Sequence, residues 1–199
     1  MTNINFTENV PRETSEKYFL LDRPDRMVTF IQDAINEEYL DNLPLFWKTF
    51  RELWTDSEFT HEIKALLFMI ISEHWEMEVV ADSHNCCENK NEREQYMKLT
   101  NQDKVKVYRG QREEDDTGVS WTLDKGRAKW FGQRFYFPKE FSEQVSRPDL
   151  YRGNAVLLSG WVKGKDIVSY FNCREEEEVL ILTPDRRIND LKIEVLKND

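Results

Sequence analysis

The stretch Arg174-Glu175-Glu176-Glu177-Glu178-Val179-Leu180-Ile181 decides how the second half of this chain is interpreted. A run of acids is usually a solvated charge run, but here it leads directly into an apolar segment of the kind that forms buried strands. The pattern therefore predicts a strand over 179–182, with acidic side chains held where that strand begins.

The sequence on both sides of the acids is patterned as strands with one helix among them. Strand candidates have alternating polarity or short apolar runs rich in β-branched and aromatic residues, and they lie at 104–107, 118–122, 155–162, 167–171 and 191–196. Residues 124–135 have the pattern of an isolated helix between the second and third of these strands. We expect a mostly β domain over 101–199.

Residues 1–100 are patterned as helices instead. After a polar arm over 1–22, apolar residues recur at steps of three and four from Arg23 onward, and further helices are expected over 44–54 and 57–75. Residues 82–103 are polar and are expected to hold a loop, with room for one short helix. The fold class is therefore α+β: an N-terminal α-helical region, acting as a cap or in target recognition, followed by the β domain.

Composition disfavours several classes of protein. Hydrophobic residues make up 39% of the chain, which is enough for a core and unlike a disordered protein. A net charge of −10 disfavours binding to bulk nucleic acid. The longest apolar run, 65–71, is far shorter than the ~20 residues of a membrane span, and no signal peptide is visible. We expect a cytoplasmic protein that does not contact membranes.

Cofactor and metal motifs are scarce in the sequence. The adjacent Cys86 and Cys87, with Cys173, fit reduced thiols rather than a disulfide framework or a structural zinc site. The sequence contains no phosphate-binding loop, no dinucleotide-binding glycine motif and no serine nucleophile elbow. The common nucleotide-binding and hydrolase folds are therefore not supported.

Three short segments, each at a strand edge, stand in a set order: Val107-Tyr108-Arg109-Gly110, then Gly118-Val119-Ser120-Trp121-Thr122, then the acidic run. This order resembles the Arg–Ser–Glu branch of the ADP-ribosyltransferases, which includes clostridial-type toxins, vertebrate ecto-transferases and many bacterial and phage proteins. The resemblance covers roughly residues 104–182. It implies an ADP-ribosyltransferase-like split β-sandwich with a helix between strands.

The resemblance implies an enzyme that splits NAD, its substrate, at the nicotinamide bond and passes ADP-ribose to a macromolecule, without a metal. Cleavage builds positive charge on the ribose, so a carboxylate beside it stabilises the transition state. By resemblance this carboxylate is Glu178. Glu176, on the same face of an extended chain, would orient or deprotonate the acceptor. Glu175 and Glu177 form a competing pair in the alternate register.

The residues that would bind NAD also follow from the resemblance. Arg109 would hold an NAD phosphate through a forked contact, and Gly110 would let the chain approach the cofactor closely. Ser120 would bond the ribose or hold the catalytic carboxylate. Trp121 and Thr122 complete the second motif, where the family commonly has a small residue and a serine.

The family chooses its acceptor partly with the loop before the acids, which here includes Tyr170, Phe171 and Asn172. We expect an aromatic residue of this loop to contact the target, unless it ends the preceding strand inward. Glu at the first position of the acidic pair resembles arginine-modifying members, so a protein side chain is favoured as acceptor over nucleic acid. The resemblance suits an intracellular effector, such as a bacterial toxin or a phage-encoded modifier acting in the host cytoplasm.

Two alternatives remain open from the sequence. One is an NAD glycohydrolase with the same site and water as the acceptor. The other is a binding module on the same fold, which would grip a partner through the N-terminal helices without catalysis.

Overall fold

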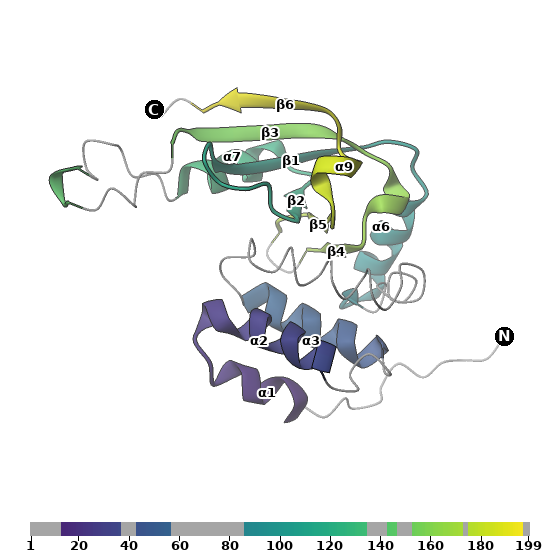
Figure 1. The fold of residues 1–199 in the computed structure, drawn as a ribbon. Coiled ribbons are helices and arrows are strands. Elements are labelled where there is room, and N and C mark those ends of the chain that lie inside the picture. Colours follow the sequence, from purple (N-terminus) through teal and green to yellow (C-terminus); the bar gives the residue numbers. More distant parts are fainter. Residues whose placement is uncertain are drawn as a thin grey trace. The chain divides into compact units, whose positions relative to one another are not determined.

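The computed structural model describes residues 13–36, 43–56, 86–134, 143–146, 153–172 and 175–196 (Figure 1). The chain divides into two compact units, Met1–Cys86 and Cys87–Asp199. This division precedes the predicted boundary at 100/101, because helix α6 (Lys90–Thr100) packs on β4 and η4 of the second unit. The fold is α+β, with an open antiparallel sheet and several helices.

The first unit contains helices α1 (Glu13–Phe19), α2 (Arg23–Asn36) and α3 (Leu43–Asp56). The two helices predicted from the apolar spacing are confirmed as α2 and α3. Part of the segment predicted as a polar arm is helical, because Tyr18 of α1 is buried and packs edge-on against Phe30 at 5.4 Å between ring centroids. The helix predicted over 57–75 lies outside the described residues.

Aromatic residues form most of the core of this unit. Phe30 of α2 stacks on Phe46 of α3, and Phe50 stacks on Trp54 one turn further along α3. All four are buried. The aromatic positions of α2 and α3 therefore form the core face of these two helices.

The second unit is built on a six-stranded sheet with the order β4-β5-β2-β1-β3-β6, in which every described pairing is antiparallel. The strands are β1 (Val105–Arg112), β2 (Ser120–Thr122), β3 (Ala155–Val162), β4 (Ser169–Phe171), β5 (Glu178–Leu180) and β6 (Asn189–Val195). Strands form at all the predicted places, although β2, β4 and β5 are short.

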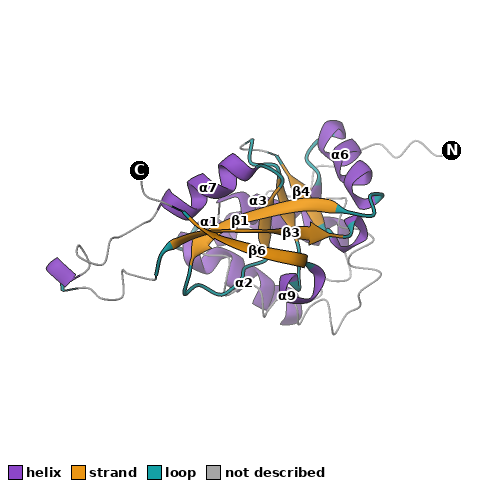
Figure 2. Ribbon diagram, turned by 90° about the horizontal axis from the view of Figure 1, so that it is seen from above, coloured by secondary structure: helices purple, strands orange, loops and turns teal. Residues whose placement is uncertain are grey.

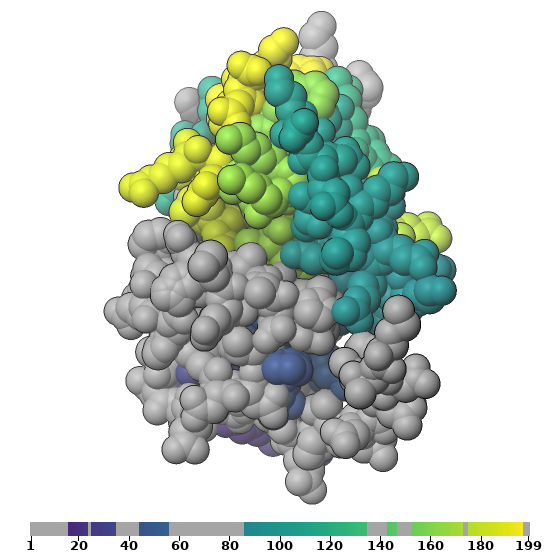
Figure 3. All heavy atoms as spheres, turned by 90° about the vertical axis from the view of Figure 1, so that its right-hand side faces the viewer, coloured from purple at the N-terminus to yellow at the C-terminus, as the bar shows by residue number. Residues whose placement is uncertain are grey.

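Among the described residues, this unit also contains the helices α6, α7 (Lys125–Arg134) and α9 (Pro184–Arg187) and the 3-10 helix η4 (Gly164–Asp166). Helix α7 lies between β2 and β3 in sequence, as predicted, and packs along β1 (Figure 2). Helix α6 contributes Tyr96 and Leu99 to the main hydrophobic core. Figure 3 shows its teal atoms against the green atoms of the segment that includes η4.

No helix among the described residues is long and apolar enough to cross a membrane.

Candidate functional site

The register of β2, β5 and β4 shows which side chains share each face of the sheet. Trp121, Val179 and Tyr170 are partners across the three strands, and all belong to the hydrophobic core. Because side chains alternate along a strand, Ser120 and Glu178 stand on the opposite face. Trp121 is 2% exposed, so its side chain lies in the core and not on the face that carries Ser120 and Glu178.

Ser120 and Glu178 meet on that opposite face. The Ser120 hydroxyl donates a hydrogen bond of 2.5 Å to Oε1 of Glu178, from β2 to the adjacent β5. Thr122 is the register partner of Glu178, and its hydroxyl donates to the carbonyl of Glu176 at 2.5 Å. The same hydroxyl accepts the N–H of Asp124 at 3.0 Å, just before α7. Thr122 therefore ties the acidic run to the start of α7.

The acidic run is not an extended chain until it reaches β5. Glu175 and Glu177 have φ values of +55° and +44°, in the left-handed region that few residues other than glycine adopt. The backbone between Glu176 and Glu178 is therefore not extended, although the prediction that they share a face assumed an extended chain. The turn is held by Glu177, whose N–H donates to Asn172 Oδ1 at 3.3 Å and whose carbonyl accepts the Leu123 N–H at 3.1 Å.

Arg109, on β1, bonds to the same serine that holds Glu178. Its Nη1 donates to the Ser120 carbonyl at 2.6 Å, and its Nε donates to Oε1 of Gln111 at 2.9 Å. Burial lowers the pKa of Arg109 to about 10, while the negative charges of Asp115 and Glu178 act in the opposite direction. A cation and a carboxylate thus interact across this part of the sheet.

Two glycines lie beside these groups for different reasons. A Cβ added to Gly118 would lie 2.5 Å from Nη2 of Arg109, so this glycine makes room for the guanidinium. A Cβ on Gly110 would lie 1.8 Å from the Ala128 carbonyl oxygen and 2.4 Å from the Gly132 nitrogen, both on α7. Gly110 therefore permits close packing of α7 on β1, which corrects its predicted role of letting the chain approach a cofactor.

The predicted acceptor loop is mostly interior. Tyr170 and Phe171 lie in β4 and are 3% and 1% exposed. Burial raises the pKa of Tyr170 to about 12, with smaller contributions from nearby Glu177, Glu92 and Cys87. Tyr170 belongs to the core cluster, as the inward-facing alternative expects, whereas Phe171 is the register partner of Glu178 and stands on the face that carries Ser120.

Asn172 is the exposed member of that loop. Its N–H donates to Oε1 of the buried Glu92 at 2.8 Å, and Glu92 Oε2 accepts the N–H of Glu88 at 2.8 Å. Helix α6 thereby positions the turn that leads to the acids. Residues 173–174 lie outside the described residues.

No role is predicted from the sequence for Gln111 and Glu92, which hold Arg109 and the acidic turn, and Gly118 is part of a motif without a predicted role. Gln111 stands two residues after Arg109 on the same strand, so alternation offered a signal for it. Glu92 offered none, because its contact with Asn172 spans 80 positions of sequence.

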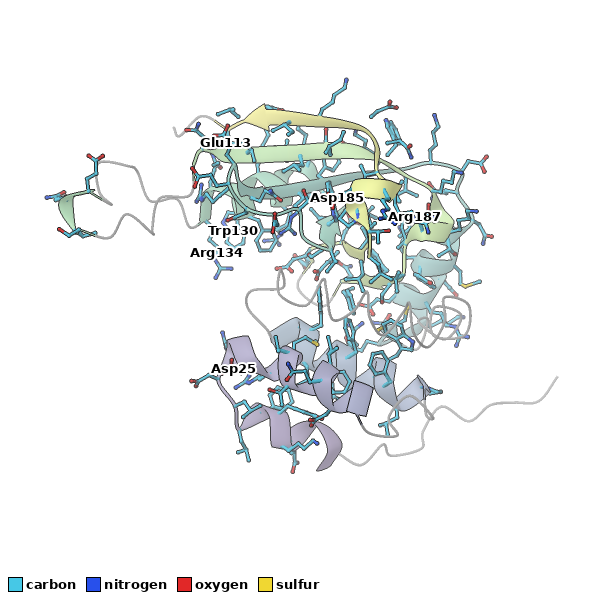
Figure 4. All side chains as sticks on the ribbon, in the orientation of Figure 1. Asp25, Glu113, Trp130, Arg134, Asp185 and Arg187 are labelled. Atoms are coloured by element: carbon cyan, nitrogen blue, oxygen red, sulfur yellow. The ribbon has the colours of Figure 1, made fainter. Side chains whose placement is uncertain are left out.

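An aromatic and basic cluster lies on α7. Arg127 Nη2 donates to the Glu175 carbonyl at 3.4 Å, which joins α7 to the acidic turn. Trp130 is 45% exposed, and the guanidinium of Arg134 lies 4.8 Å from its ring centroid. Figure 4 shows Trp130 and Arg134 side by side.

Among the described residues, no three His, Cys, Asp or Glu side chains form a group that could hold a metal ion. Comparison with protein-family models finds no match, and no curated protein and no solved structure matches the chain.

Proposed function

We propose that this chain is a mono-ADP-ribosyltransferase that cleaves NAD and transfers ADP-ribose to a macromolecule, as an intracellular effector. The observation that carries the proposal is the hydrogen bond from the Ser120 hydroxyl to the Glu178 carboxylate, with Arg109 bonded to the carbonyl of the same serine. These three residues come from three separate segments, each of which resembles the corresponding motif of the Arg–Ser–Glu transferases. Ser120 contacts both of the other residues, Glu178 through its hydroxyl and Arg109 through its carbonyl, which supports a joint role.

The sheet supports a related proposal about the fold. The helix α7 lies between β2 and β3, and the open sheet carries the three motifs on β1, β2 and β5. This arrangement is compatible with an ADP-ribosyltransferase-like split β-sandwich, which we propose as the architecture of the second unit.

In the proposed reaction, the glycosidic bond between the ribose and the nicotinamide ring breaks. Its electron pair leaves with the ring, which becomes neutral, and the ribose carbon gains positive charge. The Glu178 carboxylate stabilises that charge, and the hydrogen bond from Ser120 fixes the carboxylate in one orientation beforehand. The acceptor then bonds to the same carbon and loses its proton.

Arg109 has two functions in this proposal. Its positive charge attracts the NAD diphosphate, and its bonds to the Ser120 carbonyl and to Gln111 hold the guanidinium plane in one orientation. Because it donates to the backbone of β2, it also fixes the strand that carries Ser120.

Glu176 is the proposed group that receives the acceptor proton. Its carbonyl is held by Thr122, so its backbone position is set by β2. A protein arginine is the favoured acceptor, because the acidic pair begins with Glu as in the arginine-modifying members it resembles.

A second candidate, NAD hydrolysis, is favoured by one specific observation. The two aromatic residues expected to contact a macromolecular acceptor, Tyr170 and Phe171, are buried. An acceptor loop whose aromatic residues are buried offers less surface to a macromolecule, which favours water as the acceptor.

One experiment tests both candidates. Purified wild type and Glu178→Gln are incubated with adenylate-labelled NAD and a bacterial lysate, and labelled macromolecules and released nicotinamide are both measured. We expect a labelled macromolecule with wild type and a ~10²–10³-fold slower reaction in the variant. Glu114→Gln, at an exposed acid on the loop after β1, is the matched control and should react at the wild-type rate.

Nicotinamide release without a labelled macromolecule would favour hydrolysis. If wild type released no nicotinamide, or if wild type and Glu178→Gln reacted at equal rates, the proposed enzyme would be contradicted. A binding module on the same fold would then be the favoured alternative.

A further inference from the structure

The edge strand β6 exposes an apolar row. Leu191, Ile193 and Val195 are 45%, 64% and 56% exposed, and β6 is the outermost strand beside β3 (Figures 1 and 2). Sheet edges are normally protected by lysine and other charged side chains, by proline or by bulges. Lys192 and Glu194 of β6 stand on the opposite face from the apolar row. The irregularity in the pairing of β6 with β3 lies near Ser159 and Trp161, toward the start of β6, and leaves Ile193 and Val195 in regular register.

The apolar row continues the face that forms the core. Val195 is opposite Val156, and Ile193 is opposite Leu158. Both β3 residues are nearly fully buried in the core cluster. The apolar face that is buried on β3 therefore continues onto β6, where it is exposed.

The backbone of β6 is also oriented for pairing. The Leu196 N–H donates to the Ala155 carbonyl at 2.8 Å, so this amide points toward β3. In a regular antiparallel strand the direction alternates, so the N–H and C=O groups of Val195 and Ile193 point away from β3. These are the groups that a further strand would bind.

The side chains of β6 are complementary to themselves. If a second β6 pairs antiparallel with Ile193 opposite its own copy, Leu191 falls opposite Val195 and Lys192 falls opposite Glu194. Opposite charges and apolar pairs across strands are both stabilising. A two-fold axis at Lys192 or at Glu194 would set like charges opposite each other, and an axis at Leu191 or at Val195 would set Ile193 opposite a polar residue.

The ion pairs that Glu194 forms within the chain are too weak to prevent it from pairing with Lys192 of a second copy. Its carboxylate oxygens lie 3.6 Å from Lys125 Nζ and 3.9 Å from Lys129 Nζ, and all three side chains are about half exposed. Exposed pairs of this length contribute little. Glu194 therefore remains able to accept a contact from Lys192 of another copy.

We propose that β6 pairs edge to edge with β6 of a second copy of this chain, around a two-fold axis at Ile193, so that one antiparallel sheet runs through both copies. The contact is isologous, as closed dimers require. An interface centred on one strand pair is small, so the dimer dissociates on dilution.

The full chain is tested by sedimentation velocity over a series of micromolar concentrations. We expect wild type to shift from 23.9 kDa toward twice that mass as concentration rises. Ile193→Lys sets two ammonium groups opposite each other at the axis, and the dimer should be lost. Met97→Lys is the matched control, since Met97 is 50% exposed on α6, away from the edge, and it should dimerise like wild type.

A wild type that stays at 23.9 kDa throughout overturns the proposal. A dimer that persists in Ile193→Lys overturns it equally, because the association would then use another surface. Circular dichroism of both variants checks that the fold is kept.

A cross-link tests the register directly. Opposite residues of a hydrogen-bonded antiparallel pair have Cα atoms about 5.5 Å apart, within the ~4.4–6.8 Å range of disulfides. Ile193→Cys should therefore give a disulfide-linked dimer under mild oxidation, while Met97→Cys and wild type do not. Equal cross-linking of Ile193→Cys and Met97→Cys would contradict the two-fold axis at Ile193.

Discussion

Ser120 and Glu178 are joined by a hydrogen bond of 2.5 Å between neighbouring strands, although they lie 58 positions apart in sequence. In the register, Ser120 is opposite Leu180 and Glu178 is opposite Thr122, so the bond runs diagonally between two rows of the sheet. The geometry of this pair therefore depends on the pairing of β2 with β5. A carboxylate held this way is oriented before any ligand binds.

Replacing Ser120 with Ala should lower kcat/KM for NAD cleavage while leaving the fold intact. The carboxylate of Glu178 keeps its place on β5 but loses the hydrogen bond from the Ser120 hydroxyl. A hydrogen bond to a charged group contributes about 1.5–3 kcal/mol, which corresponds to a loss of roughly ten- to hundredfold. Ser159→Ala, on β3, is the control and should retain activity. Equal activity of the two variants would remove Ser120 from the site.

Glu176→Gln should reduce transfer to the acceptor more than it reduces NAD hydrolysis, because the proposed role of Glu176 concerns the acceptor proton. Both rates are measured with labelled NAD in the same reaction. Glu177→Gln is the control, since Glu177 holds the turn through its backbone N–H and carbonyl, which the substitution keeps. Parallel losses of transfer and hydrolysis in Glu176→Gln would show that this division of roles is wrong.

Gly118→Ala should weaken NAD binding through Arg109, because the new Cβ would lie 2.5 Å from Nη2 of that guanidinium. The effect is expected in KM. In an Arg109→Ala background, the same substitution should have little further effect. A double-mutant cycle measures this coupling. Additive losses would mean that Gly118 acts independently of Arg109.

Gly110→Ala and Gly126→Ala should change stability in opposite directions. A Cβ at Gly110 meets the backbone of Ala128 and Gly132, so α7 must move, at a cost of about 1–3 kcal/mol or more. Gly126 lies in the exposed first turn of α7, where a Cβ would lie 3.1 Å from Oδ1 of the exposed Asp124 side chain, which can move aside. In a helix Ala is favoured over Gly by about 0.5–1 kcal/mol. Urea unfolding measures the free energy of unfolding of both variants, which should fall in Gly110→Ala and rise in Gly126→Ala. A stable Gly110→Ala protein would contradict the close approach of α7 to β1.

Asp33→Asn should lower the stability of the first unit at neutral pH. The Lys17 ammonium, donating at 2.9 Å, lowers the pKa of Asp33 below 3.8; partial burial opposes this, and the Tyr18 hydroxyl adds to the lowering. A lowered folded-state pKa stabilises the fold above the unfolded-state pKa, and this contribution is lost as pH falls through the folded value.

Thermal unfolding followed by tryptophan fluorescence measures the effect of Asp33→Asn. Because the ion pair is partly exposed, the difference from wild type should be below about 1 kcal/mol at pH 7. This difference should shrink further as the pH falls below the unfolded-state pKa of Asp33 and through its lowered folded-state pKa. A difference that does not change with pH would mean that the charge of Asp33 is not what stabilises α1 on α2.

Local sequence patterns determined most of the secondary structure. The spacing of Met27, Phe30 and Ile31 predicted α2, and the alternation around Val105 and Val107 predicted β1. Helical and strand periodicities are properties of neighbouring residues, so they can be read without knowing the fold. The same is true of the position of Glu178 at the start of β5.

Only the tertiary structure decided which residues meet and which face each one takes. The sequence did not show that Trp121 and Tyr170 belong to the core, that Gly110 lies against α7, or that Glu177 turns the chain with a positive φ. These features depend on the register between distant strands and on helix packing. Those are set by which non-local pairings bury the core best, whereas a local sequence pattern carries information only about its own neighbours.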